Sequence, residues 1–278
     1  MRIAISAEST IDLPQEVLDK YKIKTVPFTI LLGEKMGLDG VITTQEIFEY
    51  VAKNKVLPKT CAVNEAQYEE HFANILKDAD SIIHFTLSSE MSCAYQNAVS
   101  ASRKFKNVHI IDSRSLSTGI ALLAIKASKM VENGYDVAHI VNQCLEDTRK
   151  VQASFVLNKL DYLRKGGRCS GLVYFGANIL QIRPQILVKS GKMSPNKKYR
   201  GNYDHCVVNY CKDTLAEFPN QDKSVAFVTY TTASDFAVDY AYNALKDAGF
   251  KEIYKTNAGA TITSHCGPNT LGILFLTV

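Results

Sequence analysis

The stretch SIIHFTLSSEMSCAYQNAVSASRKFKNVHIID, residues 81–112, decides the fold class. An apolar strand is predicted at residues 81–87, a helix at residues 91–104 and a second strand at residues 108–112. A strand, a helix and a further strand in succession form the repeating unit of a parallel sheet with helices on its faces. We therefore predict an α/β protein whose first sheet is mainly parallel.

The same alternation extends outward from this stretch as far as about residue 150. Two of the expected helices begin with capping-box spacing, in which a Thr or Asn is followed three residues later by Glu or Gln. Strands are expected at 2–7 and 24–32. Helices are expected to begin at Pro14, after Thr43 and after Asn64, and two further helices are expected to cover 115–132 and 136–150.

After residue 150 the pattern changes, which indicates a second domain. Ser190 and Gly191 separate two short β-rich runs, a signal for a hairpin, so this second sheet is expected to be mixed and partly antiparallel. We predict two α/β domains, residues 1–150 and 151–278, packed tightly because no Pro-, Gly- or Ser-rich linker separates them. The expected elements here are strands at 151–157, 184–189, 192–194 and 224–230, helices at 172–180, 206–218 and 234–247, and two terminal strands.

Composition excludes a mainly disordered chain, because 46% of the 278 residues are hydrophobic and 22% are charged. The net charge of +4 is too small to indicate nucleic acid, but it is unevenly distributed. Residues 162–203 hold nine basic and no acidic residues, so the remainder has 23 basic against 28 acidic residues. This basic segment is a candidate surface for an anionic partner. Nucleic-acid binding through it is an alternative that no recognition motif supports.

Cysteine usage and the N-terminus favour a cytoplasmic protein. The seven cysteines are odd in number, scattered and without a CxxC pair, which argues against a disulfide framework. The N-terminus reads as a strand, and no apolar run approaches the roughly 20 residues that span a bilayer. No P-loop, GxGxxG, GxSxG or metal-binding His spacing is present, so neither a cofactor nor a metal is expected.

Two polar segments follow predicted strands and precede predicted helices. Residues 86–96 place several hydroxyl groups beside the free N–H groups of a helix N-terminus, a suitable place for a carboxylate. The alternative is that Ser88 or Ser89 only caps the helix. Residues 112–119 occupy an equivalent position, with capping by the first two residues as the alternative.

Two further segments contain glycines beside charged or titratable groups. The run LRKGGR at residues 163–168 could hold a phosphate on its cations and flexible backbone, although a solvated basic turn is the commoner explanation. Near the end of the chain, His265 is expected in a tight turn, where a structural hydrogen-bonding role is the commoner one.

Together and in this order, the motifs resemble those of the DegV family of bacterial fatty-acid-binding proteins over essentially the whole chain. The resemblance includes an N-terminal motif with Glu8 in place of an aspartate, and LRKGGR without change. The matching segments are residues 6–14, 60–62, 88–96, 112–119, 163–168 and 264–272.

The resemblance implies a carrier with no catalytic residues of its own. A single long-chain fatty acid would lie in a buried tunnel between the domains, and a separate ATP-dependent kinase subunit would phosphorylate it to an acyl phosphate for phospholipid synthesis. The resemblance also implies transient contact with membrane lipid, and it implies no binding of nucleic acid. By position, the carboxylate contacts would be Thr60, Ser92 and His265, with support from Ser88, Ser89, Ser117 and Gly119, and the kinase contacts would be Arg168, Arg200 and Lys165.

This chain departs from the family pattern beside two of the carboxylate contacts. Cys61 and Ala62 follow Thr60 where the family has Ser and Gln, and Cys93 and Ala94 follow Ser92 where it has Gly and Thr. The departures are expected to reshape the mouth of the tunnel. Tunnel-lining candidates, for each of which ordinary core is the commoner role, are Phe28, Ile30, Phe85, Ile120, Leu123, Phe155 and Ile186.

A competing hypothesis is a self-contained lipid esterase or thioesterase. Ser92 would be the nucleophile, His265 the base and Asp112 the group that orients the imidazole. The absence of GxSxG counts against this alternative.

Overall fold

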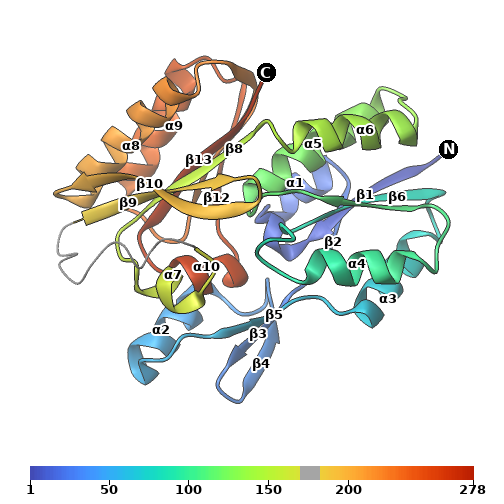
Figure 1. Cartoon of the computed structure of the whole chain (residues 1–278), viewed down its shortest axis with the longest axis horizontal. Coiled ribbons are helices and arrows are strands. Elements are labelled where there is room, and N and C mark those ends of the chain that lie inside the picture. Colours follow the sequence, from blue (N-terminus) through green and yellow to red (C-terminus); the bar gives the residue numbers. More distant parts are fainter. Residues whose placement is uncertain (170–181) are drawn as a thin grey trace.

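The computed structural model describes residues 1–169 and 182–278, which form three sheets surrounded by helices (Figure 1). The expected helix at residues 172–180 lies outside the described residues. The strand orders are β2-β1-β6-β7, β10-β9-β8-β13-β11-β12 and β4-β3-β5. The α/β class is confirmed.

The first sheet is entirely parallel, as predicted. Its strands are β1 (Ile3–Glu8), β2 (Ile23–Val26), β6 (Ser81–Thr86) and β7 (Val108–Asp112). One face is covered by α5 (Thr118–Glu132) and α6 (Val137–Asp147), and the other by α3 (Glu65–Ile75) and α4 (Ala94–Ser102) (Figure 1). Every residue of β6 is buried, which explains why its sequence is continuously apolar apart from small or paired polar groups.

The second sheet is mixed, also as predicted. Its strands are β8 (Val151–Leu157), β9 (Ile182–Lys189), β10 (Lys192–Arg200), β11 (Gln221–Tyr230), β12 (Glu252–Asn257) and β13 (Thr270–Thr277). Only β11 and β12 pair in parallel, and β9 and β10 form the expected hairpin around Ser190 and Gly191. The helices α8 (Tyr203–Glu217) and α9 (Asp235–Asp247) cover this sheet at the upper left of Figure 1.

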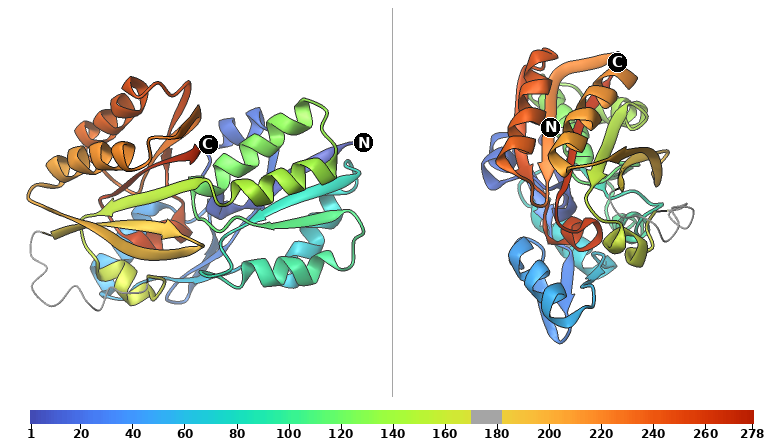
Figure 2. Two further views of the ribbon diagram at one scale, coloured as in Figure 1. Left: turned by 45° about the horizontal axis from the view of Figure 1, so that its top comes forward. Right: turned by 90° about the vertical axis from the view of Figure 1, so that its left-hand side faces the viewer.

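A third, small sheet corrects the prediction of one apolar run at residues 24–32. That run is divided between β2 of the first sheet and β3 (Thr29–Leu32), which pairs with β4 (Lys35–Leu38) and β5 (Lys59–Cys61). With α2 (Thr44–Asn54), this unit has its own small core, and it projects from one side of the molecule (Figure 2). The capping boxes predicted at Thr43 and Asn64 are both confirmed.

Tight packing between the two larger sheets is confirmed by a continuous apolar core. Phe155 and Leu274 of the second sheet belong to the same buried cluster as Ile5 and Ile83 of the first. The β9–β10 turn is also bound across this junction, because the Ser88 hydroxyl donates a 2.8 Å hydrogen bond to the Gly191 carbonyl.

Short helical segments connect consecutive strands within the two larger sheets. They are the 3-10 turn η1 (Ser9–Ile11), α1 (Gln15–Lys20), α7 (Asp161–Gly166) and α10 (Ala260–Cys266). His265 lies in the last turn of α10, so the prediction of a tight turn there is wrong. No helix in the described part of the chain has the length and apolar character to cross a bilayer.

Candidate functional site

A hollow of about 140 Å³, here called the outer hollow, lies where the three sheets meet. Thr60 reaches it from β5, Ser92 from the turn before α4 and His265 from α10, so the structure brings together all three predicted carboxylate contacts. Arg168, just after α7, also lines it. The apolar part of the wall consists of Phe28, Ala62, Leu87, Met91, Leu116, Met193, Ile262 and Cys266.

The imidazole of His265 is held by one side-chain hydrogen bond, 2.9 Å between its Nε2 and the Thr60 hydroxyl. Its Nδ1 atom is buried and has no described partner. Burial, together with the positive charge of Arg168, lowers the pKa of His265 to about 4. The ring is therefore neutral near pH 7 and carries one N–H, which can be donated to a carboxylate oxygen.

The LRKGGR motif forms the end of α7, where Gly166 lies against this imidazole while Arg164, Lys165 and Arg168 are exposed to solvent. A Cβ atom on Gly166 would lie 2.7 Å from His265 Nδ1, so only glycine allows this approach. Gly167 ends the helix with a positive φ of 69°, the left-handed conformation typical of a helix C-terminus. The guanidinium of Arg168 donates a 2.7 Å hydrogen bond to the Gly166 carbonyl, and the side chain stays exposed at the edge of the hollow.

Ser92 lies one residue before the N-cap of α4. Its oxygen accepts a 3.2 Å hydrogen bond from the Ala94 N–H, and no described group accepts its own hydrogen. Cys93 is the N-cap residue and makes no side-chain capping bond. Ser92 can therefore donate its hydroxyl hydrogen into the outer hollow.

The alternative that Ser88 or Ser89 caps α4 is wrong, because the helix begins at Ala94. Ser88 binds the β9–β10 turn instead. Ser89 donates to Asp112 through both its hydroxyl (2.5 Å) and its backbone N–H (3.2 Å). Both residues support the loop that presents Ser92, and neither lines the outer hollow.

Thr261 is a site residue that the sequence analysis missed. It lies four residues before His265 on α10, so both side chains share one helix face. Thr261 lines the outer hollow, and its hydroxyl oxygen is buried without a described partner. An unpaired hydroxyl in such a place is costly unless a ligand satisfies it. The four-residue spacing was the available signal, although it becomes informative only once α10 is known to be a helix.

The N-terminus of α10 is bound by two buried carboxyl groups, another feature that the sequence did not reveal. Asp12 accepts from the Gly259 N–H (2.9 Å) and Asp39 from the Ala260 N–H (2.8 Å). Burial, with a further contribution from Asp39, holds the pKa of Asp12 well above its usual value. Two segments far from α10 in sequence thus fix the helix that carries Thr261 and His265.

Ser117 and Gly119 shape the start of α5. Ser117 is the N-cap residue in a strained conformation (φ 54°, ψ −140°), and its hydroxyl donates to Asp12. A Cβ atom on Gly119 would lie 2.2 Å from the Ser115 hydroxyl oxygen, so no larger residue fits. Neither Asp112 nor Ser113 caps this helix, and these capping alternatives are wrong.

A second hollow of about 30 Å³, the inner hollow, adjoins the first. Leu116, Ile262 and Cys266 line both. The inner hollow extends along the second sheet past Ala153, Phe155 and Leu274. Of the seven tunnel-lining candidates, Phe28 and Phe155 line a hollow, whereas Ile30, Phe85, Ile120, Leu123 and Ile186 are core residues.

Of the three residues predicted to contact a kinase, Arg200 lies apart from the other two. Lys165 and Arg168 lie together beside the outer hollow. The backbone of the next residue, Cys169, forms an isolated parallel β-bridge with Met193 of β10. Arg200 is exposed at the far end of β10, seven residues from Met193 and hence roughly 20 Å away along the strand.

The arrangement gives no support to a Ser-His-Asp triad. Asp112 binds Ser89 and the Arg114 backbone, and no described carboxylate is hydrogen-bonded to His265. Within residues 1–169 and 182–278, no three His, Cys, Asp or Glu side chains are grouped so as to hold a metal ion.

Fold and site together define an α/β protein with a largely apolar hollow and hydrogen-bonding groups at one end. The chain matches the family model described as "Uncharacterised protein, DegV family" over residues 2–278, and it belongs to the DegV family.

Similar proteins cover the full length of the chain. A DegV domain-containing protein from Clostridium perfringens is 30% identical, covering 99% of this chain and 98% of its own. A DegV family protein from Thermus thermophilus, whose structure describes fatty acid binding, superposes with a TM-score of 0.93 at 25% identity and covers 100% of both chains. A Thermotoga maritima protein, whose structure revealed a fatty acid binding function, has a TM-score of 0.85 at 26% identity, again over 100% of both chains.

Proposed function

We propose that this protein binds one long-chain fatty acid, with the carboxylate in the outer hollow and the hydrocarbon tail in the inner hollow. The carboxylate would accept hydrogen bonds from Ser92, from His265 and from Thr60 or Thr261. The observation that carries this proposal is the convergence of these groups at one end of a hollow whose other end is apolar.

The chemistry of the outer hollow suits a monoanion that must stay reactive. Hydroxyl groups and a neutral imidazole stabilise a carboxylate by hydrogen bonds without forming a bidentate ion pair. Arg168 supplies positive charge nearby, while its guanidinium is partly engaged by the Gly166 carbonyl. A carboxylate held in this way keeps a nucleophilic oxygen.

We further propose that a separate ATP-dependent kinase subunit phosphorylates the bound acid. A carboxylate oxygen would attack the γ-phosphorus of ATP on that subunit as the bond to ADP breaks, giving the acyl phosphate for phospholipid synthesis. Lys165, Arg168 and Arg200 would contact the kinase, because all three are exposed and basic. In this proposal the protein itself is not an enzyme and works in the cytoplasm, with transient contact with membrane lipid.

The binding proposal is tested by extraction of the purified protein with organic solvent, followed by mass spectrometry. We expect one long-chain fatty acid per chain, and recovery of the same stoichiometry when delipidated protein is titrated with that acid. Absence of a co-purified lipid combined with no uptake of fatty acids of any length would contradict the proposal.

The kinase proposal is tested separately, with Arg200→Glu and the control Lys212→Glu, an exposed residue that lines neither hollow. With a fatty acid kinase subunit and ATP, acyl phosphate is trapped as the hydroxamate. We expect Arg200→Glu to lower the rate about tenfold while both variants keep the bound lipid. An equal rate for wild type and Arg200→Glu would contradict a role for Arg200.

A further inference from the structure

A third hollow, of about 540 Å³ and here called the basic hollow, lies beside the residues proposed to bind the fatty acid's carboxylate. Thr60, His265 and Arg168 line both this hollow and the outer hollow, so they form the boundary between the two. The other residues that line it come from the segment after α2, from the end of α7 and from α10.

Four cations surround the basic hollow: Lys55, Lys59, Lys165 and Arg168. No Asp or Glu is among the described residues that line it, and none of the four side chains forms an ion pair with a described carboxylate. By contrast, lysines elsewhere, such as Lys126 and Lys255, are paired with carboxylates. A hollow lined by unpaired cations is suited to an anion of more than one charge.

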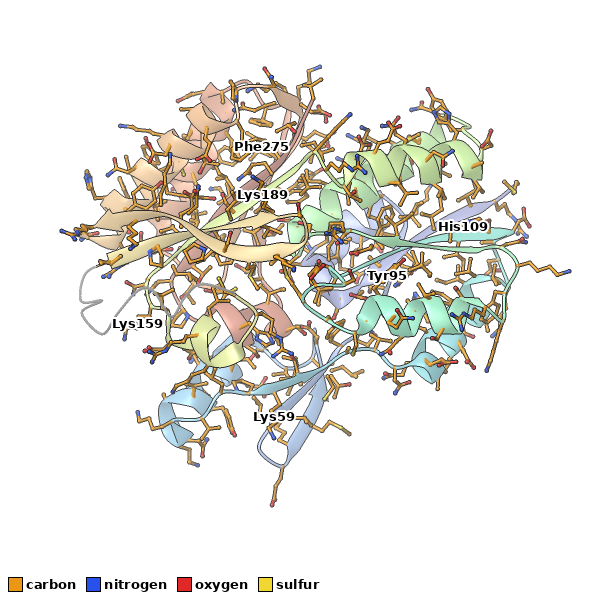
Figure 3. All side chains as sticks on the ribbon, viewed as in Figure 1. Lys59, Tyr95, His109, Lys159, Lys189 and Phe275 are labelled. Carbon is orange, nitrogen blue, oxygen red and sulfur yellow. The ribbon has the colours of Figure 1, made fainter. Side chains whose placement is uncertain are left out.

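Lys55 occupies an unusual backbone position for a lysine. It is the C-cap residue of α2 with φ 59°, the left-handed conformation in which glycine or asparagine costs less. Lys59 lies at the start of β5, one residue before Thr60 (Figure 3). Two separate elements, α2 and β5, therefore contribute cations to the hollow that Thr60 also lines.

We propose that the basic hollow binds the phosphoryl group of the acyl phosphate, an inference that rests on the proposed function. In an acyl phosphate the phosphorus is bonded directly to a carboxyl oxygen. If that carboxyl group lies at Thr60 and His265, the basic hollow is the neighbouring space that shares both of these residues with the outer hollow, and a phosphoryl group added from solvent would enter it. The phosphoryl group adds negative charge that Lys55, Lys59 and Lys165 would neutralise. The protein would then retain the product as well as the fatty acid.

The test compares two ligands of equal chain length on delipidated protein: a fatty acid and a 2-oxoalkylphosphonate, in which a methylene replaces the bridging oxygen of the acyl phosphate. The variant is Lys55→Gln/Lys59→Gln/Lys165→Gln, which leaves Arg168 in place because it also lines the outer hollow. The matched control is Lys106→Gln/Lys212→Gln/Lys251→Gln, three exposed lysines that line none of the three hollows.

We expect the basic-hollow variant to bind the phosphonate about tenfold or more weakly, and the fatty acid no more than about threefold more weakly, because each lost cation acts mainly on the phosphonate. The control variant should match wild type for both ligands. An unchanged phosphonate affinity, or equal losses for both ligands, would overturn the proposal. If wild type binds neither ligand, the proposed function itself is wrong.

Discussion

The outer and inner hollows differ in whether their polar groups already have partners. In the inner hollow, the Thr231 hydroxyl donates to the Gly267 carbonyl at 2.7 Å, and the Thr229 hydroxyl is shared with Thr118 and Thr256. Among the residues that line the outer hollow, Thr261 and His265 each have a buried polar atom, the hydroxyl oxygen and Nδ1, without a described partner. The inner hollow thus presents an apolar surface, whereas the outer hollow keeps unsatisfied groups for a ligand.

This difference assigns separate roles to the two ends. Burial of hydrocarbon in the inner hollow supplies affinity that grows with chain length, at about 0.8 kcal/mol for each methylene. Hydrogen bonds in the outer hollow supply direction and selectivity for a carboxylate, at about 1.5–3 kcal/mol for a bond to a charged group. Changes at the two ends should therefore have different signatures.

The largest effect is expected from filling the inner hollow. Ala153 is buried on β8 beside Leu274, and the side chain of Ala153→Phe would fill the inner hollow. We expect an 18-carbon acid to bind about 100-fold or more weakly and a ten-carbon acid to be little affected, as measured by calorimetry. The milder Ala153→Val should give an intermediate loss if the larger variant fails to fold. Equal losses for both acids would contradict the assignment of the tail.

A smaller and more selective effect is expected at the outer hollow. Ser92→Ala removes one donor, so an acid should bind about tenfold more weakly, while its methyl ester should be unaffected. The control is Ser100→Ala on α4, the helix that follows Ser92, because Ser100 lines neither hollow. Equal losses for acid and ester would show that Ser92 only supports the fold.

An indirect effect is expected where α10 begins. A Cβ atom on Gly259 would lie 2.9 Å from Asp39 Oδ1 and 3.0 Å from Asp12 Oδ1. We expect Gly259→Ala to displace α10, lowering the free energy of unfolding by about 1–3 kcal/mol and weakening fatty acid binding a few-fold. Denaturant unfolding and calorimetry measure the two effects. Unchanged affinity in a destabilised variant would show that Asp12 and Asp39 do not position the site.

The smallest effect on affinity is expected from Glu8, which lies beneath the outer hollow. Its carboxylate accepts hydrogen bonds from the Leu87 N–H and from Tyr68, and burial raises its pKa from 4.5 to about 7. Because the folded pKa is the higher one, its stabilising contribution is complete below pH 4.5 and is lost as the pH rises to about 7. His71 and His265, with pKa values lowered to about 4 from 6.5, act in the opposite direction, since their contribution is lost as the pH falls through that window.

Glu8→Gln should therefore gain stability relative to wild type as the pH rises from 5 to 8, whatever the cost of the substitution at pH 5. Denaturant unfolding at a series of pH values measures this difference. A difference that is independent of pH would show that Glu8 does not titrate in this range.

The parallel sheet was predictable because β6 and β7 are local apolar runs that flank a helix. The small sheet was not, since β2 and β3 are separated by only Pro27 and Phe28 and read as one run. At the site, Ser92, Thr60 and His265 could be proposed only from the order of motifs. The sequence did not allow us to propose Thr261, Asp12 and Asp39, because their roles depend on α10, a short helix that has no side-chain cap at its N-terminus. Whether a polar group has a partner is a tertiary property that local sequence does not encode.

The most direct test of the assigned orientation is a chain-length series on delipidated protein. Fatty acids of eight to 18 carbons and their methyl esters are titrated by calorimetry. We predict an affinity that rises about fourfold for each methylene until the inner hollow is filled, with every acid about tenfold or more tighter than its ester. An affinity independent of chain length, or equal affinities for acids and esters, would contradict a ligand held by its tail in the inner hollow and by its carboxylate at Thr60, Ser92 and His265.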